Sequence, residues 1–336
     1  MWAALPEAAI GGVRLARVAR PRPAADEVLV EVMAAGMNRA DLLHARGRYS
    51  QRLRATDRPD VAGMELAGRV VEAGSCVDEA LVGGRVMAMI PGTYAEYAAV
   101  PAELLLPLPE ELDWVEAAAM PMGLLTEYEA IVRLAQVAPG ERTLVTAATS
   151  GVGLLGLQVA RHRGLEPVAT SRDGANDPVL RRLGAAAVAH GPDELGAHFP
   201  DGVDVVIDHV GGDILEAVQQ LLRDHARVVS VGRLGRRSAE IDLAAFAGRR
   251  ARLIGTTWRC QTRSEVAATV AAVRADLTEA ISAGRIRPLV SAVEPLRGIA
   301  AAYDRLGGPR RLGKVVVACH DEVADSAIAQ ADLAAG

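Results

Sequence analysis

A glycine-rich hexapeptide has residue types and a spacing that suit a chemical task. It reads Gly151-Val152-Gly153-Leu154-Leu155-Gly156, and it follows the apolar run 143–148 and opens a predicted helix over 154–163. Glycine lacks a Cβ atom, so the backbone of such a turn can approach a pyrophosphate, whose charge meets the free N–H groups and the dipole at the start of the helix. An ordinary tight turn without a ligand is the alternative. The position between a strand and a helix favours a dinucleotide site.

The end of the next predicted strand, residues 166–170, decides which dinucleotide fits. The strand is followed by Ser171, Arg172 and Asp173. An acidic residue at this tip would hydrogen-bond the ribose hydroxyls of NAD, whereas a Ser-Arg pair would hold the 2′-phosphate of NADP. Arg172 comes first and carries the positive charge, so the sequence favours NADPH, with NADH as the alternative. A solvated surface arginine is the other interpretation of Arg172.

Two kinds of pattern must position these residues. Residues 13–109 read as short apolar runs closely broken by Gly, Pro and Asp, which indicates a compact β-rich unit, interrupted by a helix over 38–46. From about residue 114 strands alternate with helices, which indicates βαβ crossovers and a doubly wound parallel sheet, so the predicted fold class is α/β. The expected strands are 143–148, 166–170, 186–189, 203–208, 226–231 and 252–256, and the expected helices between or before them are 115–135, 154–163, 177–183 and 214–222.

The rest of the chain continues this pattern. A long amphipathic helix over 264–283 is expected, then the segment 286–293, a further helix and a final strand over 313–318. Residues 321–336 are rich in Ala and Asp and are expected to form a frayed tail.

Composition excludes several classes of protein. The chain has 336 residues, which suggests two domains, and half of them are hydrophobic, which excludes general disorder. Acidic residues outnumber basic ones by 42 to 37, and no Lys/Arg-rich block suggests a nucleic-acid partner. No long uncharged apolar run suggests a membrane span, and residues 1–9 lack the basic start of a signal peptide. We therefore expect a cytoplasmic protein.

Cysteine and histidine spacing argues against a metal site. Cys76, Cys260 and Cys319 lie far apart, and none belongs to a CxxC motif. The seven histidines form no HxH or HExxH motif. The sequence therefore suggests neither a disulfide framework, nor a structural zinc lobe, nor a histidine-rich metal centre.

Several segments, in a common order over about residues 1–320, together resemble the medium-chain dehydrogenase/reductase superfamily, and specifically its zinc-free NAD(P)H:quinone oxidoreductase branch. The segments are 35–43 (AGMNRADLL), 47–49 (GRY), 63–68 (GMELAG), 125–126 (LT), 149–153 (TSGVG), 206–212 (VIDHVGG) and 313–316 (GKVV).

This resemblance implies a particular domain organisation. A GroES-like β-rich catalytic domain would comprise residues 1–118 and 260–336, with a Rossmann domain, residues 119–259, inserted into it. The nicotinamide would lie in the cleft between the two domains. A homodimer would form through the last Rossmann strand, about residues 252–257.

The resemblance also bears on metal. Zinc-dependent relatives have Cys, His and Cys where this chain has Asn38, Met64 and Met122. Amide and thioether groups are poor zinc ligands, and Glu65 alone cannot hold the ion. The four-cysteine structural lobe is also missing, because residues 91–100 contain no cysteine. We therefore expect neither catalytic nor structural zinc.

Without a Lewis acid, the easier reaction is hydride delivery to an acceptor that is already electron-poor. The leading hypothesis is a metal-free NAD(P)H-dependent oxidoreductase acting on a small quinone. An enoyl reductase acting on an α,β-unsaturated carbonyl, an enone, in a polyketide-like pathway is the alternative. A second alternative is an NADPH-binding protein with little turnover.

The resemblance assigns the site residues. Tyr49 would donate a hydrogen bond to the acceptor oxygen, Asn38 would orient Tyr49 or the substrate, and Thr126 would abut the nicotinamide. Their alternatives are a packed tyrosine, a helix N-cap and a helix hydroxyl, and Asp41 is expected to be structural. The expected cofactor-binding residues are Ser150, Gly151, Val152, Gly153, Ser171, Arg172, Val210, Gly232, Leu234, Thr256, Thr257 and Lys314.

Three positions depart from the family pattern. Glu127 stands where the branch has alanine, and we expect it to point outward from its helix rather than to act as an acid or base. Asn176 replaces a lysine and Asp173 a serine, and both changes weaken the preference for NADPH.

Overall fold

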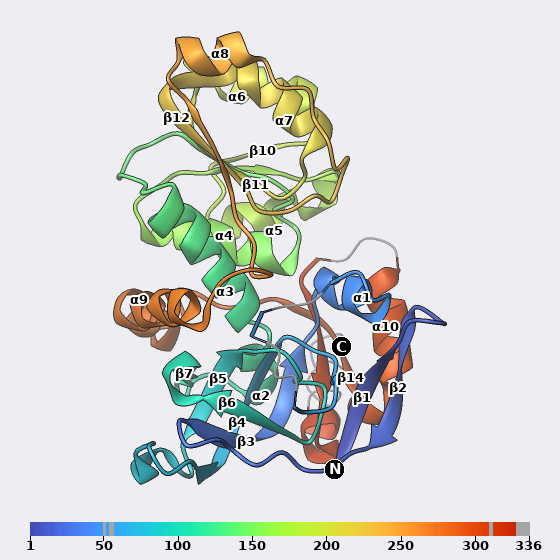
Figure 1. Ribbon diagram of the computed structural model, residues 1–336. Coiled ribbons are helices and arrows are strands. Elements are labelled where there is room, and N and C mark those ends of the chain that lie inside the picture. Colours follow the sequence, from blue (N-terminus) through green and yellow to red (C-terminus); the bar gives the residue numbers. More distant parts are fainter. Residues whose placement is uncertain (50–51, 54–56, 309–311, 327–336) are drawn as a thin grey trace. The chain divides into compact units, whose positions relative to one another are not determined.

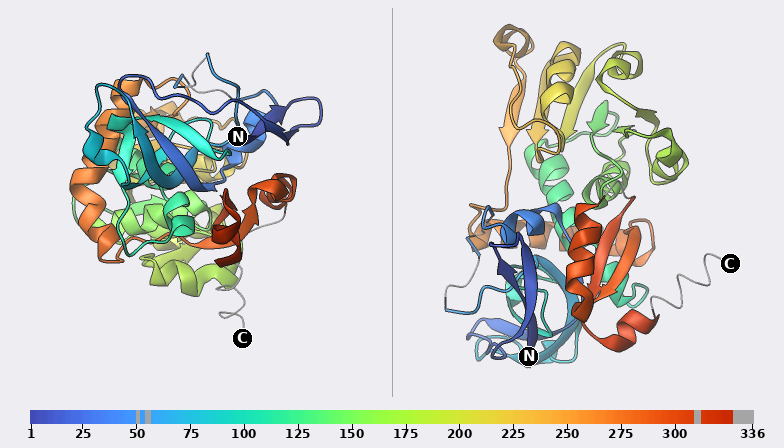
Figure 2. Two further views of the ribbon diagram at one scale, coloured as in Figure 1. Left: turned by 90° about the horizontal axis from the view of Figure 1, so that it is seen from below. Right: turned by 90° about the vertical axis from the view of Figure 1, so that its right-hand side faces the viewer.

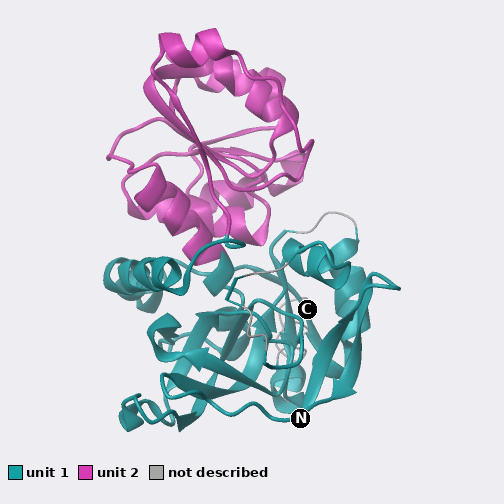
Figure 3. Cartoon of the chain, viewed as in Figure 1, with its two compact units in different colours: residues 1–122, 258–336 teal, residues 123–257 magenta. Residues whose placement is uncertain are grey.

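The computed structural model describes residues 1–49, 52–53, 57–308 and 312–326, and the chain divides into two compact units (Figure 3). Unit 1 comprises residues 1–122 and 258–336, and unit 2 comprises residues 123–257. The expected α/β architecture is confirmed: a β-rich unit is interrupted by a unit with a parallel sheet.

Unit 1 is built on a mixed sheet whose centre is the antiparallel pair β3 (Glu27–Gly36) and β4 (Glu65–Ala73). Among the described residues the sheet has seven strands, in the order β14-β15-β3-β4-β5-β7, with β6 also pairing with β3 (Figure 1). A separate hairpin joins β1 (Trp2–Glu7) to β2 (Gly12–Arg17). The other strands are β5 (Arg85–Met89), β6 (Tyr97–Pro101), β7 (Leu105–Pro107), β14 (Val290–Pro295) and β15 (Lys314–Ala318), and the helices are α1 (Arg39–Ala45), α2 (Trp114–Ala118), α9 (Arg263–Ser282) and α10 (Ile299–Gly307).

The sequence of β3 explains its central place. Val28, Val30 and Val32 are fully buried, and β-branched residues pack well on a pleated surface. Gly36 ends the strand, and a Cβ atom there would lie 2.3 Å from the carbonyl oxygen of Ala118 in α2. The glycine therefore lets α2 approach the sheet closely.

Unit 2 is a parallel sheet with the strand order β10-β9-β8-β11-β12-β13 among its described residues. Figures 1 and 2 show α4 and α5 on one face and α6 and α7 on the other. The order reverses between β8 and β11, which is the point where open α/β sheets bind ligands. The strands are β8 (Thr143–Val145), β9 (Val168–Thr170), β10 (Ala187–Ala189), β11 (Val203–Asp208), β12 (Leu222–Ser230) and β13 (Arg252–Gly255), and the helices are α3 (Pro121–Tyr128), α4 (Gly151–His162), α5 (Asp177–Arg182), α6 (Leu195–His198), α7 (Gly212–Val218) and α8 (Leu243–Gly248).

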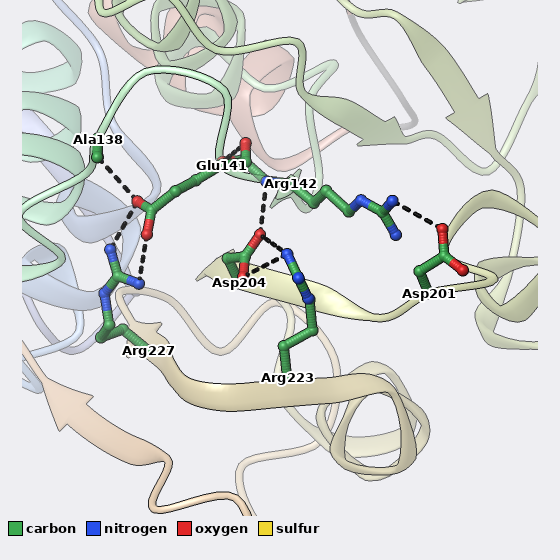
Figure 4. A network of polar contacts seen from close by, with 8 residues as sticks. Ala138, Glu141, Arg142, Asp201, Asp204, Arg223 and Arg227 are labelled. Atoms are coloured by element: carbon green, nitrogen blue, oxygen red, sulfur yellow. Dashed lines mark hydrogen bonds and ion pairs between the residues drawn. The ribbon is translucent and has the colours of Figure 1, made fainter.

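Ion pairs link the amino ends of the central strands of unit 2 to one another (Figure 4). Arg227 donates to both carboxylate oxygens of Glu141, at 2.8 and 2.7 Å. Arg223 donates to both oxygens of Asp204, at 3.0 Å each. These pairs tie β12 to the segments that begin β8 and β11, at the sheet edge opposite the glycine-rich turn.

One expected helix is interrupted in the structure. The single helix expected over 115–135 is three pieces, because α2 ends at Ala118, Pro121 begins α3, and residues Glu129–Leu134 form a π-helical turn. A proline fits the first turn of a new helix, where its missing N–H is not needed.

The C-terminal segment also differs from expectation. Residues 321–326 are helical and bury Val323 and Ala324, so the prediction of a frayed tail is wrong for these residues. These two buried side chains hold the segment against the rest of unit 1. Residues 327–336 lie outside the described part. In the described part of the chain, no helix combines the length and apolarity that a bilayer crossing requires.

Candidate cofactor site and a buried polar cluster

The predicted cofactor residues of unit 2 share one edge of its sheet. Because all its strands are parallel, their carboxyl ends lie at the same edge, and the predicted residues follow five of these ends. Ligands of open α/β sheets bind at this edge. Ser150, Gly151, Val152 and Gly153 follow β8, Ser171 and Arg172 follow β9, Val210 follows β11, Gly232 and Leu234 follow β12, and Thr256 and Thr257 follow β13.

The glycine-rich segment forms the first turn of α4, three residues earlier than expected. Ser150 occupies the N-cap position, and its hydroxyl accepts the N–H of Gly153 at 3.0 Å. A Cβ atom on Gly153 would lie 2.7 Å from the carbonyl oxygen of Ala147. The serine cap explains the earlier start, and the glycine explains how the helix packs directly after β8. Ser150, Gly151 and Val152 remain half-buried, with the helix N-terminus beside them.

Arg172 and Asp173, the two candidates for nucleotide selection, have different surroundings at the tip of β9. Ser171 is buried, and its hydroxyl donates to the carbonyl oxygen of Asp173 at 2.9 Å. The carboxylate of Asp173 accepts the N–H of Ala175 at 2.9 Å, which caps the following turn. Arg172 is exposed, and none of the described residues forms an ion pair with it. The acidic candidate thus has a local task, whereas the guanidinium faces solvent.

The loops after β11 and β12 are joined through Asp208 and His209. Asp208 is fully buried, and its carboxylate accepts the N–H groups of Val210 and Gly211 at 2.9 and 3.0 Å. The carbonyl oxygen of His209 accepts the N–H of Leu234 at 3.0 Å. Gly232 lies so close to the backbone of His209 that a Cβ atom would meet its carbonyl oxygen at 2.7 Å. Val210, Gly232 and Leu234 therefore belong to two loops that are joined by a hydrogen bond and by close backbone packing.

The orientation of Glu127 differs from the expected one. Glu127 does not point outward: its side chain is fully buried, and its Oε1 lies 2.8 Å from Nε2 of His209. Burial is the largest single influence on the pKa of His209 and lowers it, but the carboxylates of Glu127 and Asp208 together leave that pKa raised. Gly156 has no Cβ atom and so leaves room for this carboxylate. The neighbouring Thr126 lies on the same helix and is also buried.

Unit 1 contains a buried polar cluster around Glu65. The carboxylate forms an ion pair with the Lys314 ammonium, which also donates to Oδ1 of Asn38. Nδ2 of Asn38 donates to Oε1 of Glu65 at 2.7 Å, and the N–H of Met122 donates to Oε2 at 2.8 Å. Buried charges are stable when paired and hydrogen-bonded in this way. Lys314 thereby serves as the counter-ion of Glu65 inside unit 1.

Asn38 and Asp41 begin α1 within this cluster. Asn38 is the N-cap residue, and its N–H donates to Oδ2 of Asp41 at 2.6 Å. The Tyr94 hydroxyl donates to the same oxygen at 2.7 Å. Burial is the largest influence on Asp41 and raises its pKa to about 7. The structural role expected for Asp41 accords with this placement.

Tyr49 lies in unit 1 at the end of the segment that follows α1. The guanidinium of Arg259 stacks 4.5 Å from the centre of its ring, and the same guanidinium donates to the carbonyl oxygen of Arg48. The phenol is half-buried. A cation over the ring fixes the orientation of the phenol.

The residues at the position that the resemblance assigns to a catalytic zinc do not fit that ion. Met64 and Met122 offer thioethers and Asn38 an amide, and both oxygens of Glu65 are already hydrogen-bonded or ion-paired. No group of three or more His, Cys, Asp and Glu side chains that could hold a metal occurs among the described residues.

Sequence reasoning missed three features of these sites. These are the ion pair of Lys314 with Glu65, the pair of Glu127 with His209, and the hydroxyl of Tyr94 on Asp41. The first two partners are separated by 249 and 82 residues, so no local pattern marks them. The one available signal was Glu127 itself, a carboxylate in an apolar helix.

A chain with a GroES-like unit, a parallel-sheet unit and a glycine-rich turn at the switch point has the architecture of a two-domain dehydrogenase. A family model described as an alcohol dehydrogenase GroES-like domain matches residues 24–110, and one described as a zinc-binding dehydrogenase matches residues 175–317.

Individual relatives agree with these matches. The quinone oxidoreductase from Thermus thermophilus, solved also in complex with NADPH, is 31% identical with a TM-score of 0.80, over 95% of this chain and 100% of that one. Human quinone oxidoreductase is 28% identical over 89% of this chain and 91% of its own length. Polyketide synthase GfsB from Streptomyces halstedii is 32% identical over 87% of this chain, which spans only 5% of that protein. The chain belongs to the medium-chain dehydrogenase/reductase superfamily, in its zinc-free quinone oxidoreductase branch.

Proposed function

We propose that the protein is a metal-free, NADPH-dependent reductase of quinones. The observation that carries the proposal is the shared sheet edge of unit 2, where the capped N-terminus of α4 and the exposed Arg172 follow neighbouring strands. The helix N-terminus suits a pyrophosphate, and the guanidinium suits a 2′-phosphate. The NADPH complex of the Thermus thermophilus relative supports the choice of dinucleotide.

Bound NADPH would supply the hydride, and the chain's own residues would orient the reactants. Ser150, Gly151 and Val152 would hold the pyrophosphate through the start of α4. Arg172 would hold the 2′-phosphate, Ser171 would fix the turn that carries Arg172 through its hydrogen bond to Asp173, and Thr126 would abut the nicotinamide. Asn38 is a positioning residue in this proposal, because its amide is engaged with Glu65 and Lys314.

Charge that develops on a quinone oxygen needs a donor, and Tyr49 is the proposed one. Its phenol carries one O–H, and Arg259 fixes the ring by stacking on it. The proposal needs no Lewis acid, which accords with a Glu65 carboxylate neutralised by Lys314 rather than left open as a ligand.

A second candidate is reduction of an α,β-unsaturated carbonyl in a biosynthetic pathway. The observation that favours it is the 32% identity to a polyketide synthase over 87% of this chain. Both reactions use the same hydride geometry, and a fold hosts many substrates.

A steady-state comparison of acceptors tests the proposal. NADPH consumption is measured with 9,10-phenanthrenequinone and with an enoyl thioester at matched concentrations. The proposal expects a kcat/KM for the quinone at least about tenfold above that for the thioester, which is about 1.4 kcal/mol of transition-state binding. The opposite ratio would transfer the function to the second candidate. Binding of NADPH without turnover of either acceptor would support a binding protein instead.

Tyr49→Phe tests the proposed donor within the same assay. Loss of one donor to a developing oxyanion is expected to lower kcat by about a hundredfold while NADPH affinity is unchanged. Tyr97→Phe is the matched control, because that phenol donates to Glu31 at 3.3 Å elsewhere in unit 1. An unchanged kcat for Tyr49→Phe would make Tyr49 a packing residue.

We also propose that two copies of the chain pair through β13. Among the described residues β13 has β12 as its one neighbour in the sheet, and its Leu253 side chain is 46% exposed. An open strand edge with an exposed apolar residue is a template for pairing with a second strand.

A further inference from the structure

The buried ion pair between Glu127 and His209 has no task in the proposed reaction. We propose that this pair is a positioning device for the cofactor site: it holds α3 and the loop after β11 in fixed register with the glycine-rich start of α4. The inference rests on the proposed function, because binding of NADPH is its readout.

The pair connects elements that carry predicted cofactor contacts. Glu127 follows Thr126 directly on α3, and His209 precedes Val210 directly after β11. The two side chains meet at 2.8 Å, and both are at least 95% buried. A shift of either side chain therefore moves a neighbour, Thr126 or Val210, that is predicted to contact the cofactor.

A third contact comes from the glycine-rich motif itself. A Cβ atom on Gly156 would lie 2.6 Å from Oε2 of Glu127 and 2.7 Å from its Cδ atom. The last glycine of the motif thus leaves space for a carboxylate that reaches across from α3. The ordinary explanation of this glycine is close packing of the helix on the sheet, and here the close neighbour is a charged side chain.

The backbone of His209 transmits its position to a second loop. Its N–H donates to Oγ1 of Thr146 at 2.7 Å, and its carbonyl oxygen accepts the N–H of Leu234 at 3.0 Å. Gly232 packs against the same backbone. Displacement of His209 would therefore disturb Val210, Gly232 and Leu234 together.

Energetics argue for a positioning role over simple stabilisation. A buried ion pair costs desolvation of both charges, so it is weak evidence for stability and is often replaceable by apolar residues. In this chain the pair fixes one arrangement of α3, α4 and the loop after β11. Oε1 of Glu127 on α3 reaches His209 in that loop, and Oε2 fills the space beside Gly156 on α4.

Four variants of the full chain test the proposal by fluorescence titration with NADPH, well below each variant's melting temperature. Glu127→Ala removes the carboxylate, Glu127→Gln removes only its charge, and Gly156→Ala displaces it without removing any charge. The fourth variant combines Glu127→Ala with Gly156→Ala. Glu141→Gln is the matched control, because Glu141 also pairs with a cationic side chain in unit 2, but at the opposite sheet edge.

The expected result is a split between affinity and stability. Glu127→Ala and Gly156→Ala each raise the dissociation constant of NADPH about tenfold, and Glu127→Gln raises it about threefold. The double variant stays within about twofold of Glu127→Ala, because the added methyl group no longer meets a carboxylate. Glu141→Gln lowers the melting temperature but leaves the dissociation constant within about twofold of wild type.

Different results overturn different claims. If wild type binds NADPH and both Glu127 variants bind it equally well, the pair has no positioning role while the proposed function stands. If the two single effects multiply in the double variant, the carboxylate and Gly156 act independently, and the proposed register is wrong. If Glu127→Ala does not fold, Glu127→Gln decides. If wild type binds neither NADPH nor NADH, the proposed function itself fails, and this inference fails with it.

Discussion

Arg172 is the single residue on which cofactor selection rests in this account. It is exposed at the tip of β9, while the carboxylate of the adjacent Asp173 caps its own turn. Arg172→Ala is expected to raise KM for NADPH at least about tenfold and KM for NADH less than about threefold, because only NADPH carries the 2′-phosphate. Steady-state kinetics with both cofactors measures the two effects.

A second exposed arginine serves as the control for Arg172. Arg182 lies at the end of α5, away from the strand tip, and Arg182→Ala should leave both KM values unchanged. Equal effects of Arg172→Ala on NADPH and NADH would remove Arg172 from the 2′-phosphate site.

Asp41 makes the stability of the protein depend on pH. Burial raises its pKa to about 7, from a usual value of 3.8. Between these two values the folded state holds a proton that the unfolded state releases, so stability contributed by Asp41 is present in acid and is lost as the pH rises toward 7. The slope from this one group is at most about 1.4 kcal/mol per pH unit.

Asp41→Asn isolates this effect, because the amide keeps an acceptor for Tyr94 but cannot ionise. We expect the melting temperature of wild type to fall relative to that of Asp41→Asn as the pH rises from 5 to 7, and the difference to level off above that range. Calorimetry at several pH values measures both proteins. A constant difference across this range would show that Asp41 does not titrate there.

Residue types alone could predict some site members and not others. The place of Gly151 and Gly153 at the start of a helix could be predicted, because they stand between an apolar run and a helical pattern. Lys314 could be found but not its task, because Glu65 lies 249 residues away and only the folded sheet of unit 1 brings the two together. The outward orientation expected for Glu127 was wrong, because its carboxylate turns inward into a space that Gly156 leaves on another helix, α4.

Among the elements, α4 connects the glycine motif to the sheet most directly. A Cβ atom on Gly153 would lie 2.7 Å from the carbonyl oxygen of Ala147 and 2.8 Å from the Cα atom of Ala148. Gly153→Ala is therefore expected to push the start of α4 away from β8, and to weaken NADPH binding at least about tenfold by titration.

Gly248→Ala provides the control for this element. Gly248 ends α8 and has no atom within 4 Å of a built Cβ, so its substitution should leave NADPH affinity unchanged. Unchanged affinity in Gly153→Ala would mean that the helix start does not contact the dinucleotide.

Element boundaries followed local chemistry where that chemistry was strong. The strand expected over 203–208 is β11 with the same bounds, because its apolar run is bordered by a glycine and a turn. The helix expected over 115–135 is broken, because continuous hydrophobicity did not indicate where Pro121 restarts it. Periodicity identifies buried segments better than it identifies their interruptions.

At the scale of the whole molecule, the open edge of β13 predicts a homodimer. Light scattering after gel filtration should give a mass of about 70 kDa, twice the 35.2 kDa of one chain. Leu253→Asp should shift the mass toward one chain, because a charge on the exposed edge opposes strand pairing. Ile10→Asp is the control, since Ile10 is 69% exposed in unit 1. A monomeric wild type would contradict this assembly.

The chain as a whole is proposed to work without a metal, with the Glu65 carboxylate paired to the ammonium group of Lys314. The most direct test follows NADPH oxidation by 9,10-phenanthrenequinone before and after exhaustive dialysis against a chelator, with the zinc content of the same samples measured. Our prediction is undiminished turnover by a protein that contains far less than one zinc per chain. Activity that disappears on chelation and returns with added zinc would contradict it.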